Sequence, residues 1–288
     1  MLLVLLSIFS LSCSENGRED FKPIERPKDK KARKTPPVHG RVNFPAGQVR
    51  VLLVPPGTTA ARAGFKPGDA LVSADGKKIT SEQQVERITA SAGGEIEFEV
   101  VSGGGLYMKT LPPGTPGWLL LSGATFRTSL IAASQRRPRA RANEISAVRA
   151  LELFEYSSGR RRRAFSFQGP ALCLFFTIRE GKDKEALSAF ARGCPGHGAK
   201  CMAVDTLELA TAVRRPERWQ RELEKAAAML REKAALFVDH LQAAANALGI
   251  RNTPVVIAID AAGRPIRRLE GSRCTDAEAI SEQAVRVG

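Results

Sequence analysis

Two cysteines and one of the chain's three histidines lie in the segment CPGHGAKC, which runs from Cys194 to Cys201. A dithiol at this spacing can exchange disulfides, and Cys-x-x-His-x-x-x-Cys offers three soft metal ligands, with Cys274 able to act as a fourth. A proline and two glycines between the cysteines also permit tight closure. We therefore predict a Cys194–Cys201 disulfide that contributes about 2 to 3 kcal/mol, with His197 facing solvent. A pairing of Cys201 with Cys173, or free buried thiols, are the alternatives.

The rest of the sequence has few residues arranged for catalysis. No serine stands in a motif with matching histidine and aspartate, and no glycine-rich phosphate loop is present, because SGGGL lies in an expected hairpin. His39 lies in a charged spacer, and His240 lies in an expected helix, where a structural or solvent-facing role is the default. The sequence therefore predicts no cofactor and favours a protein that is not an enzyme.

The first thirteen residues, MLLVLLSIFSLSC, form an apolar run that ends in small residues and a cysteine. The run has the length of a secretory signal and is too short to span a bilayer as a helix. It resembles a bacterial lipoprotein signal, which implies lipidation of Cys13 and a protein that is anchored in the cell envelope and faces the periplasm. Simple secretion and a misassigned start or buried segment are the alternatives. Export would place the other cysteines where disulfides persist.

The chain is strongly basic, with a formal net charge of +14 over 288 residues. The segment 14–39 is charged and proline-rich, which predicts a solvated tether. Near an acidic membrane leaflet each of its lysines would add about 1 kcal/mol of attraction; otherwise it is a soluble spacer. The arginine clusters at 134–144 and 159–163 lack interleaved aromatic residues and a recognition helix, so we expect a linker and a strand rim and no nucleic-acid partner.

A first globular block has the pattern of short strands, tight turns and two helices. A β-branched strand over 49–54 is followed by a short helical turn and by a strand that turns at Asp75-Gly76. A second helix begins at Thr80 or Ser81, where Gln83 or Gln84 completes a capping box. The block ends in a hairpin that turns through glycines.

The residues PGTTAARAGFKPGDALVSADGKKI closely resemble the PDZ domains of bacterial envelope proteins, and the resemblance covers 40–112. It implies a PDZ-like β-barrel or sandwich with two helices, which adds an extended peptide, usually a C-terminus, between a strand and the second helix. A scaffold domain that has lost peptide binding would keep the same turn glycines. The peptide-binding residues that the resemblance implies are Gly40, Arg41 and Val42 in the carboxylate loop, and Val85 and Ile88 on the helix.

A second globular block begins near residue 150. The segment 113–149 connects the two blocks, and its apolar part, PGWLLLSGATFRTSLIAAS, predicts one or two strands that sequence alone assigns to neither neighbour. PALCLFFTI is a near-continuous apolar strand of the type buried on both faces of a sheet. A helix over 182–193, the strand AKCMAVD and a long alanine-rich helical region over 216–248 follow.

The last part of this block, GIRNTPVVIAIDAAGRPIRRLEG, strongly resembles membrane-tethered thioredoxin-like proteins over 150–288. The resemblance implies an α/β thioredoxin-like fold with a long helical insertion and a cis peptide bond between Thr253 and Pro254 beside the active site. Where active members carry Cys-x-x-Cys, this chain has Glu180 and Asp183. Carboxylates at a helix start can cap the helix or bind a cation, but they cannot form a disulfide.

Together, the signal, the two family resemblances and the replaced cysteines predict a non-catalytic, envelope-anchored binding or scaffold protein. Its partners would be envelope proteins or peptides held in the PDZ-like groove, with the groove beside Pro254 as a second docking surface. A thiol-disulfide oxidoreductase that uses Cys194 and Cys201 is the alternative, and a metal-binding protein is a minor one. CPGHGAKC follows the helix at whose start the family's chemistry occurs, about 15 Å away, which favours a structural disulfide.

Overall fold

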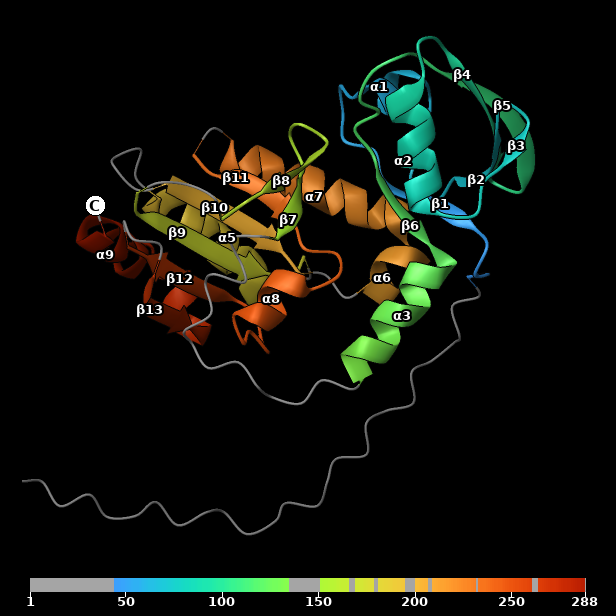
Figure 1. Ribbon diagram of the computed structural model, residues 1–288. Coiled ribbons are helices and arrows are strands. Elements are labelled where there is room, and N and C mark those ends of the chain that lie inside the picture. Colours follow the sequence, from blue (N-terminus) through green and yellow to red (C-terminus); the bar gives the residue numbers. More distant parts are fainter. Residues whose placement is uncertain are drawn as a thin grey trace, which may run out of the picture. The chain divides into compact units, whose positions relative to one another are not determined.

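The structure is a computed structural model that describes residues 44–134, 151–165, 169–178, 181–194, 200–206, 209–231, 233–260 and 264–287 (Figure 1). The chain divides into two units, Met1–Arg41 and Val42–Gly288, and every described residue belongs to the second unit. Within the described residues, no helix is long and apolar enough to cross a membrane. Cys13 and the tether 14–39 lie outside the described residues.

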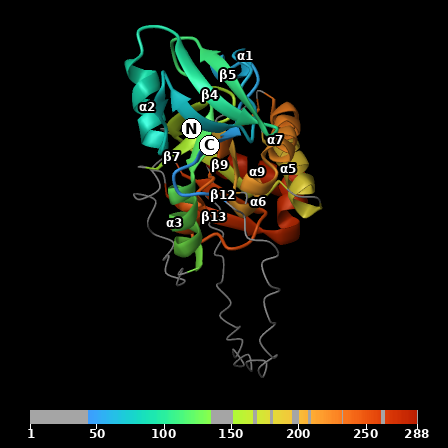
Figure 2. The same ribbon diagram turned by 90° about the vertical axis from the view of Figure 1, so that its right-hand side faces the viewer.

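The first domain is built on a six-stranded antiparallel sheet with the strand order β5-β4-β2-β1-β6, while β3 pairs with β2 off this path. Figure 2 shows α2 running beside these strands. The elements are β1 Val49–Leu53, α1 Thr59–Arg62, β2 Ala70–Ala74, β3 Lys77–Lys78, α2 Glu82–Ser91, β4 Ile96–Ser102, β5 Gly105–Leu111, β6 Leu119–Ser122 and α3 Gly123–Ser134.

Local sequence accounts for the turns and helix starts of this domain. Asp75 and Gly76 both have positive φ, at 47° and 71°, and they form the tight turn between β2 and β3. The hydroxyl of Ser81 accepts a hydrogen bond from the N–H of Gln84 at 3.2 Å, and the Gln84 side chain accepts one from the N–H of Thr80 at 3.0 Å. Ser81 therefore caps α2 as expected, while Gln84 accepts from the residue before the cap instead of from the cap residue itself.

The second domain is built on a seven-stranded mixed sheet with the order β13-β12-β9-β10-β11-β7-β8, in which β9, β10 and β11 are parallel. Four of these strands lie in the order β13-β12-β9-β10, with α5 between β9 and β10 and α9 at the end, as in a thioredoxin-like fold. The elements are β7 Glu152–Glu155, β8 Arg160–Arg163, β9 Ala171–Phe176, α5 Lys182–Gly193, β10 Lys200–Asp205, α6 Leu209–Arg214, α7 Pro216–Leu230, β11 Ala235–Val238, α8 Ala243–Ala247, β12 Val255–Ile259, β13 Pro265–Glu270, the 3-10 helix η1 Gly271–Thr275 and α9 Ala277–Val287.

Alternating strand residues bury both faces of the second sheet. On β9, Leu172 and Leu174 pack with side chains of α5, α7 and α9, whereas Cys173 and Phe175 pack with α8 on the opposite face. Every residue of β9 is buried, which confirms the fully buried strand predicted from its continuous apolar run.

Two expectations about the elements are corrected by the structure. The alanine-rich region 216–248 is not one helix, because β11 interrupts it between α7 and α8. The segment Ala-Leu-Phe-Val of β11 pairs in parallel with β10, so burial in the sheet overrides the helical preference of the flanking alanines. The first sheet also continues beyond residue 112, since β6 pairs with β1.

Strand β6 also joins the apolar cores of the two domains. Its Leu120 side chain belongs to the core of the first domain, while Leu119 and Leu121 belong to the cluster that contains Trp219 and Leu223 of α7. This alternation follows from the two-residue period of a strand. Both faces of β6 are therefore fixed by packing.

Candidate functional site

The backbone edge of β6 opposite β1 is the clearest binding feature of the first domain. Among the described strands β6 pairs with β1 alone. At its end the N–H of Ser122 points away from β1 and donates to the buried Glu82 carboxylate of α2 at 2.6 Å. Because backbone groups alternate along a strand, the N–H and C=O of Leu120 point the same way. The free edge of β6 thus faces α2.

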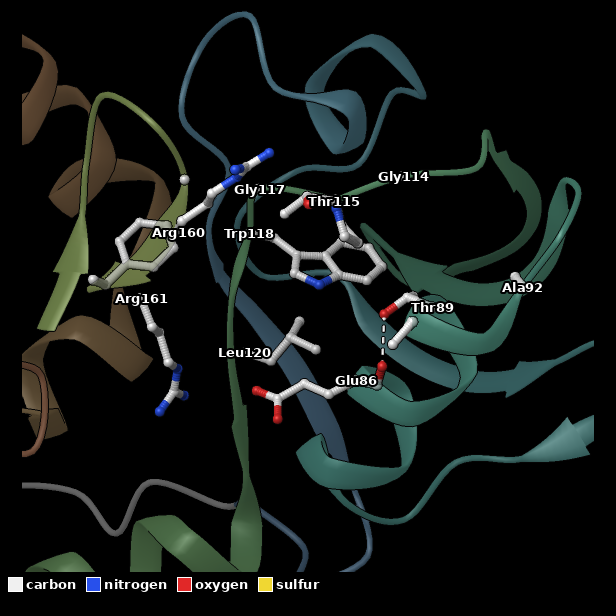
Figure 3. Close-up of a pocket in the computed structure, with 14 residues that line it drawn as sticks. Glu86, Thr89, Ala92, Gly114, Thr115, Gly117, Trp118, Leu120, Arg160 and Arg161 are labelled. Carbon is white, nitrogen blue, oxygen red and sulfur yellow. Dashed lines mark hydrogen bonds between the residues drawn. The ribbon is translucent and has the colours of Figure 1, made fainter. Parts of the chain in front are cut away.

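A pocket of about 590 Å³ lies along this edge (Figure 3). Glu86, Thr89 and Ala90 of α2 line one wall, and Leu120 of β6 lines another. Trp118 lies between them, where its ring packs edge-on against the rings of Phe65 and Phe98 at centroid distances of 4.9 and 5.7 Å. The pocket is therefore a groove with a fixed aromatic wall between a strand edge and a helix.

The loop 114–117 closes the groove where β6 begins. The carbonyl of Pro116 accepts a hydrogen bond from the N–H of Ala60 at 2.8 Å, which ties the loop to α1. Gly117 has a φ of +76°, and a Cβ there would lie 2.6 Å from the Thr58 side chain, so glycine is required. Within the described residues the N–H groups of Thr115 and Gly117 donate no hydrogen bond. Both residues line the pocket.

The hairpin formed by β7 and β8 of the second domain lines the remaining wall. Its Gly159, at a φ of +63°, approaches the loop so closely that a Cβ would lie 2.6 Å from the Cα of Gly117. The next two residues, Arg160 and Arg161, line the pocket with exposed side chains. Burial and the charge of Arg161 lower the pKa of His240 to about 3, so this histidine is neutral at pH 7.

A second constellation surrounds the cis peptide bond between Thr253 and Pro254. The Thr253 hydroxyl donates to the Thr177 hydroxyl at 3.1 Å, and the Thr177 N–H donates to Asp183 Oδ1 at 3.3 Å. Asp183 lies in the first turn of α5. The structure thus brings three of the four expected residues of this site together, while Glu180 lies outside the described residues.

Asp205 of β10 is the buried carboxylate next to this constellation. Its Oδ1 accepts a hydrogen bond from the N–H of Ile178 at 3.1 Å, and its Oδ2 accepts one from the indole N–H of Trp219 at 2.8 Å. A carboxylate that accepts two such bonds is held in a structural role. Sequence reasoning did not single out Asp205, because nothing in AKCMAVD distinguishes it from a strand-end polar residue.

The cysteines lie away from solvent. Cys194 and Cys201 form a disulfide and are both buried. Burial raises the pKa of the Cys173 thiol, and burial together with Glu270 and Asp183 raises that of Cys274 to about 11. Both free thiols are therefore protonated at neutral pH and are poor nucleophiles. No three His, Cys, Asp or Glu side chains of the described residues cluster as a metal site would require; His197 lies outside those residues.

Comparison with known proteins identifies the segment that contains α2 and the strands β1 to β4. Residues 50–101 match the family model for PDZ domains. The chain contains a PDZ domain. Two proteins whose names propose a zinc metalloprotease activity, from Brucella suis and Brucella melitensis, are each 50% identical to this chain over 48 residues. That match covers 16% of this chain and 13% of each relative, so the likeness concerns one domain.

Solved structures are similar to about half of this chain. Mycobacterium tuberculosis DsbF is 11% identical to this chain with a TM-score of 0.39. The match covers 52% of this chain and 100% of DsbF. StoA from Bacillus subtilis is 15% identical with a TM-score of 0.36, over 48% of this chain and 98% of that one. The exposed lipoprotein thioredoxin Etrx1 from Streptococcus pneumoniae is 16% identical with a TM-score of 0.38, and the match covers 47% of this chain and 98% of Etrx1.

The helix residues that the resemblance to PDZ domains implied do not line this pocket. Val85 is fully buried in the domain core and does not line the pocket, and Ile88 is half-buried against the same core. The pocket is lined instead by neighbours on the adjacent stripe of α2, one residue further along the helix. Apolar side chains mark the core face of an amphipathic helix, so the polar stripe beside them was the sequence signal for the groove. Gly40, Arg41 and Val42 lie outside the described residues.

Proposed function

We propose that the PDZ domain binds an extended peptide segment of a partner protein as an added strand on β6. The observation that carries this proposal is the edge of β6 that no other described strand pairs with, which faces α2 across a pocket of about 590 Å³. An added strand would pair with the backbone of Leu120, and its side chains would meet Trp118 and Thr89. The bound segment is a C-terminus, and its carboxylate is held at the loop 114–117.

The free amides of this loop support the assignment of the carboxylate end. Thr115 and Gly117 offer N–H donors immediately before β6, and oriented backbone amides form a concavity that suits an anion. This role was expected for Gly40, Arg41 and Val42. We assign it to 114–117 because that loop adjoins the edge of β6 that no described strand covers.

We further propose that the thioredoxin-like domain acts without thiol exchange at the position usual for the fold. Asp183 lies at the start of α5, and its carboxylate accepts the Thr177 N–H. In this proposal the domain is a rigid support, and the surface beside Pro254 is a second docking face. The absence of any cofactor is part of the same proposal.

The proposed location is the cell envelope, with a lipid anchor on Cys13 and the segment 14–39 as the tether. The apolar run that precedes Cys13 and the Cys194–Cys201 disulfide support this location. We therefore propose that the signal covers residues 1–13 and that the tether covers residues 14–39. The partners would then be envelope proteins.

Selection of peptides from a library with free, randomised C-termini tests the proposed peptide binding on the full chain. Ala90→Arg places a long charged side chain in the groove wall and should reduce binding of the selected peptides at least tenfold. Gln83→Arg adds the same charge to an exposed position of α2 outside the pocket and should leave binding unchanged. If wild-type protein selects no peptide, or if both variants bind like wild type, peptide binding in this groove is wrong.

A further inference from the structure

Two arginines of the thioredoxin-like domain lie at the PDZ groove without a partner. Arg160 and Arg161 line the pocket and are exposed, and within the described residues neither guanidinium group forms a salt bridge or donates a hydrogen bond. The neighbouring Arg162, by contrast, pairs with Glu155 at 3.0 Å. The Glu155 carboxylate of the hairpin is therefore paired with Arg162. Arg160 and Arg161 line the groove with guanidinium groups that have no acidic partner among the described residues.

The backbone fixes the position of these arginines. Gly159 lies so close to Gly117 that a Cβ on Gly159 would clash with it. The hairpin and the loop therefore pack directly against each other. The turn is held from within, because the Gly159 N–H donates to the carbonyl of Glu155 at 3.0 Å and the Ser158 hydroxyl donates to the Glu155 carboxylate at 2.6 Å. The hairpin is therefore a wall of the groove that the PDZ domain itself does not supply.

The charges that line the groove favour an anionic ligand. Its charged residues are Glu86, Arg160 and Arg161, which leaves a net charge of +1. In Figure 3 Arg160 extends along the loop that contains Thr115 and Gly117, where the proposed function places a peptide carboxylate. Arg161 lies further along the groove, on the side of β6 that faces the hairpin.

From this arrangement we infer that the thioredoxin-like domain completes the PDZ groove and selects acidic C-terminal peptides. Arg160 binds the terminal carboxylate together with the loop amides, and Arg161 binds an acidic side chain upstream. The four residues of β6 span about 13 Å, so the preference should fall within the last four peptide residues. This inference rests on the proposed function, because it names the peptides that the same groove takes.

The experiment repeats the library selection with the full chain and two matched double variants. Arg160→Ala/Arg161→Ala removes the two pocket-lining charges. Arg162→Ala/Arg163→Ala removes the same charge from the same strand outside the pocket. Wild type and the control should select peptides with aspartate or glutamate in the last four positions. The first variant should lose that preference and bind those peptides about 10 to 100 times more weakly, as expected when a charge-assisted hydrogen bond is lost.

A third variant tests the hairpin contact separately from its charge. Gly159→Ala keeps both arginines but places a Cβ against Gly117, so it should weaken binding of the same peptides to a similar extent. Affinity for the acidic peptides should also fall with added salt, because the guanidinium groups are exposed.

The possible results separate this inference from the proposed function. If wild type selects peptides without an acidic preference, or if Arg160→Ala/Arg161→Ala retains the preference, the role of the hairpin is wrong while peptide binding stands. If no variant selects any peptide, both proposals fail. Stronger binding after Arg160→Ala/Arg161→Ala would show that the hairpin obstructs the groove, and it would overturn the inference.

Discussion

Reduction of the Cys194–Cys201 disulfide should lower the free energy of unfolding by about 2.4 kcal/mol. The two cysteines are separated by 7 positions in the sequence, and cross-linking a loop of that length removes about 8 cal/mol/K of entropy from the unfolded chain. Both side chains are buried in the main core cluster of the thioredoxin-like domain. Cys194→Ala/Cys201→Ala should therefore cost more than reduction, since it also removes two packed sulfur atoms, at roughly 1 kcal/mol each.

Urea denaturation of the oxidised, reduced and alanine-substituted proteins measures these differences. Cys173→Ala is the matched control, because Cys173 is fully buried but free, and it should lose only the packing contribution of one sulfur. The same samples are tested for reduction of insulin. An unchanged free energy of unfolding after reduction would refute the structural role. Insulin turnover that Cys194→Ala abolishes would favour a thiol-disulfide oxidoreductase instead.

Two further perturbations test the packing between the domains and the buried histidine. Gln220→Ala removes the side-chain oxygen that accepts a hydrogen bond from the buried Val54 N–H at 2.8 Å. In urea titrations this change should lower the free energy of unfolding by about 1 to 3 kcal/mol. The control Arg221→Ala, at an exposed position of the same helix, should have little effect. For His240 the folded-state pKa of about 3 lies below the ordinary value of 6.5, so its stabilising contribution is complete above pH 6.5 and decreases as the pH falls toward 3. His240→Gln should make stability less dependent on pH in this range, and an unchanged slope between pH 7 and pH 4 would contradict the assignment.

Much of the PDZ domain could be predicted from interactions between residues that are close in sequence. The Asp75-Gly76 turn and the Ser81 cap depend on residues that are close in sequence, so their geometry follows from their types. The pairing of β6 with β1 depends on contact between residues about 70 positions apart. An apolar segment such as WLLLS carries no information about which strand it joins, so the groove strand could not be assigned from sequence.

The thioredoxin-like domain shows the same limit. The continuous apolar run of β9 is a local feature and predicted a buried strand, whereas the cis bond before Pro254 was implied by the resemblance to thioredoxin-like proteins. The strand β11 could not be separated from the helices on either side, because alanine favours a helix until sheet pairing is known. The placement of Arg160 at the groove is a tertiary contact, and its sequence indicated only an exposed strand rim.

The packing of β6 gives a physical reason why the two domains should act as one binding unit. A PDZ groove in isolation needs only its strand and helix, but here the reverse face of the groove strand packs on α7 through Leu119 and Leu121. The loop that precedes this strand is contacted by Gly159 of the β7–β8 hairpin. A peptide added to β6 would therefore stabilise a strand that both domains already hold, and loosening of the α7 contact should weaken binding without any change in the groove. Gln220→Ala provides that comparison, because its side chain bonds to Val54, the residue after β1, and lies outside the pocket. Weaker peptide binding in this variant is the result expected for a single unit.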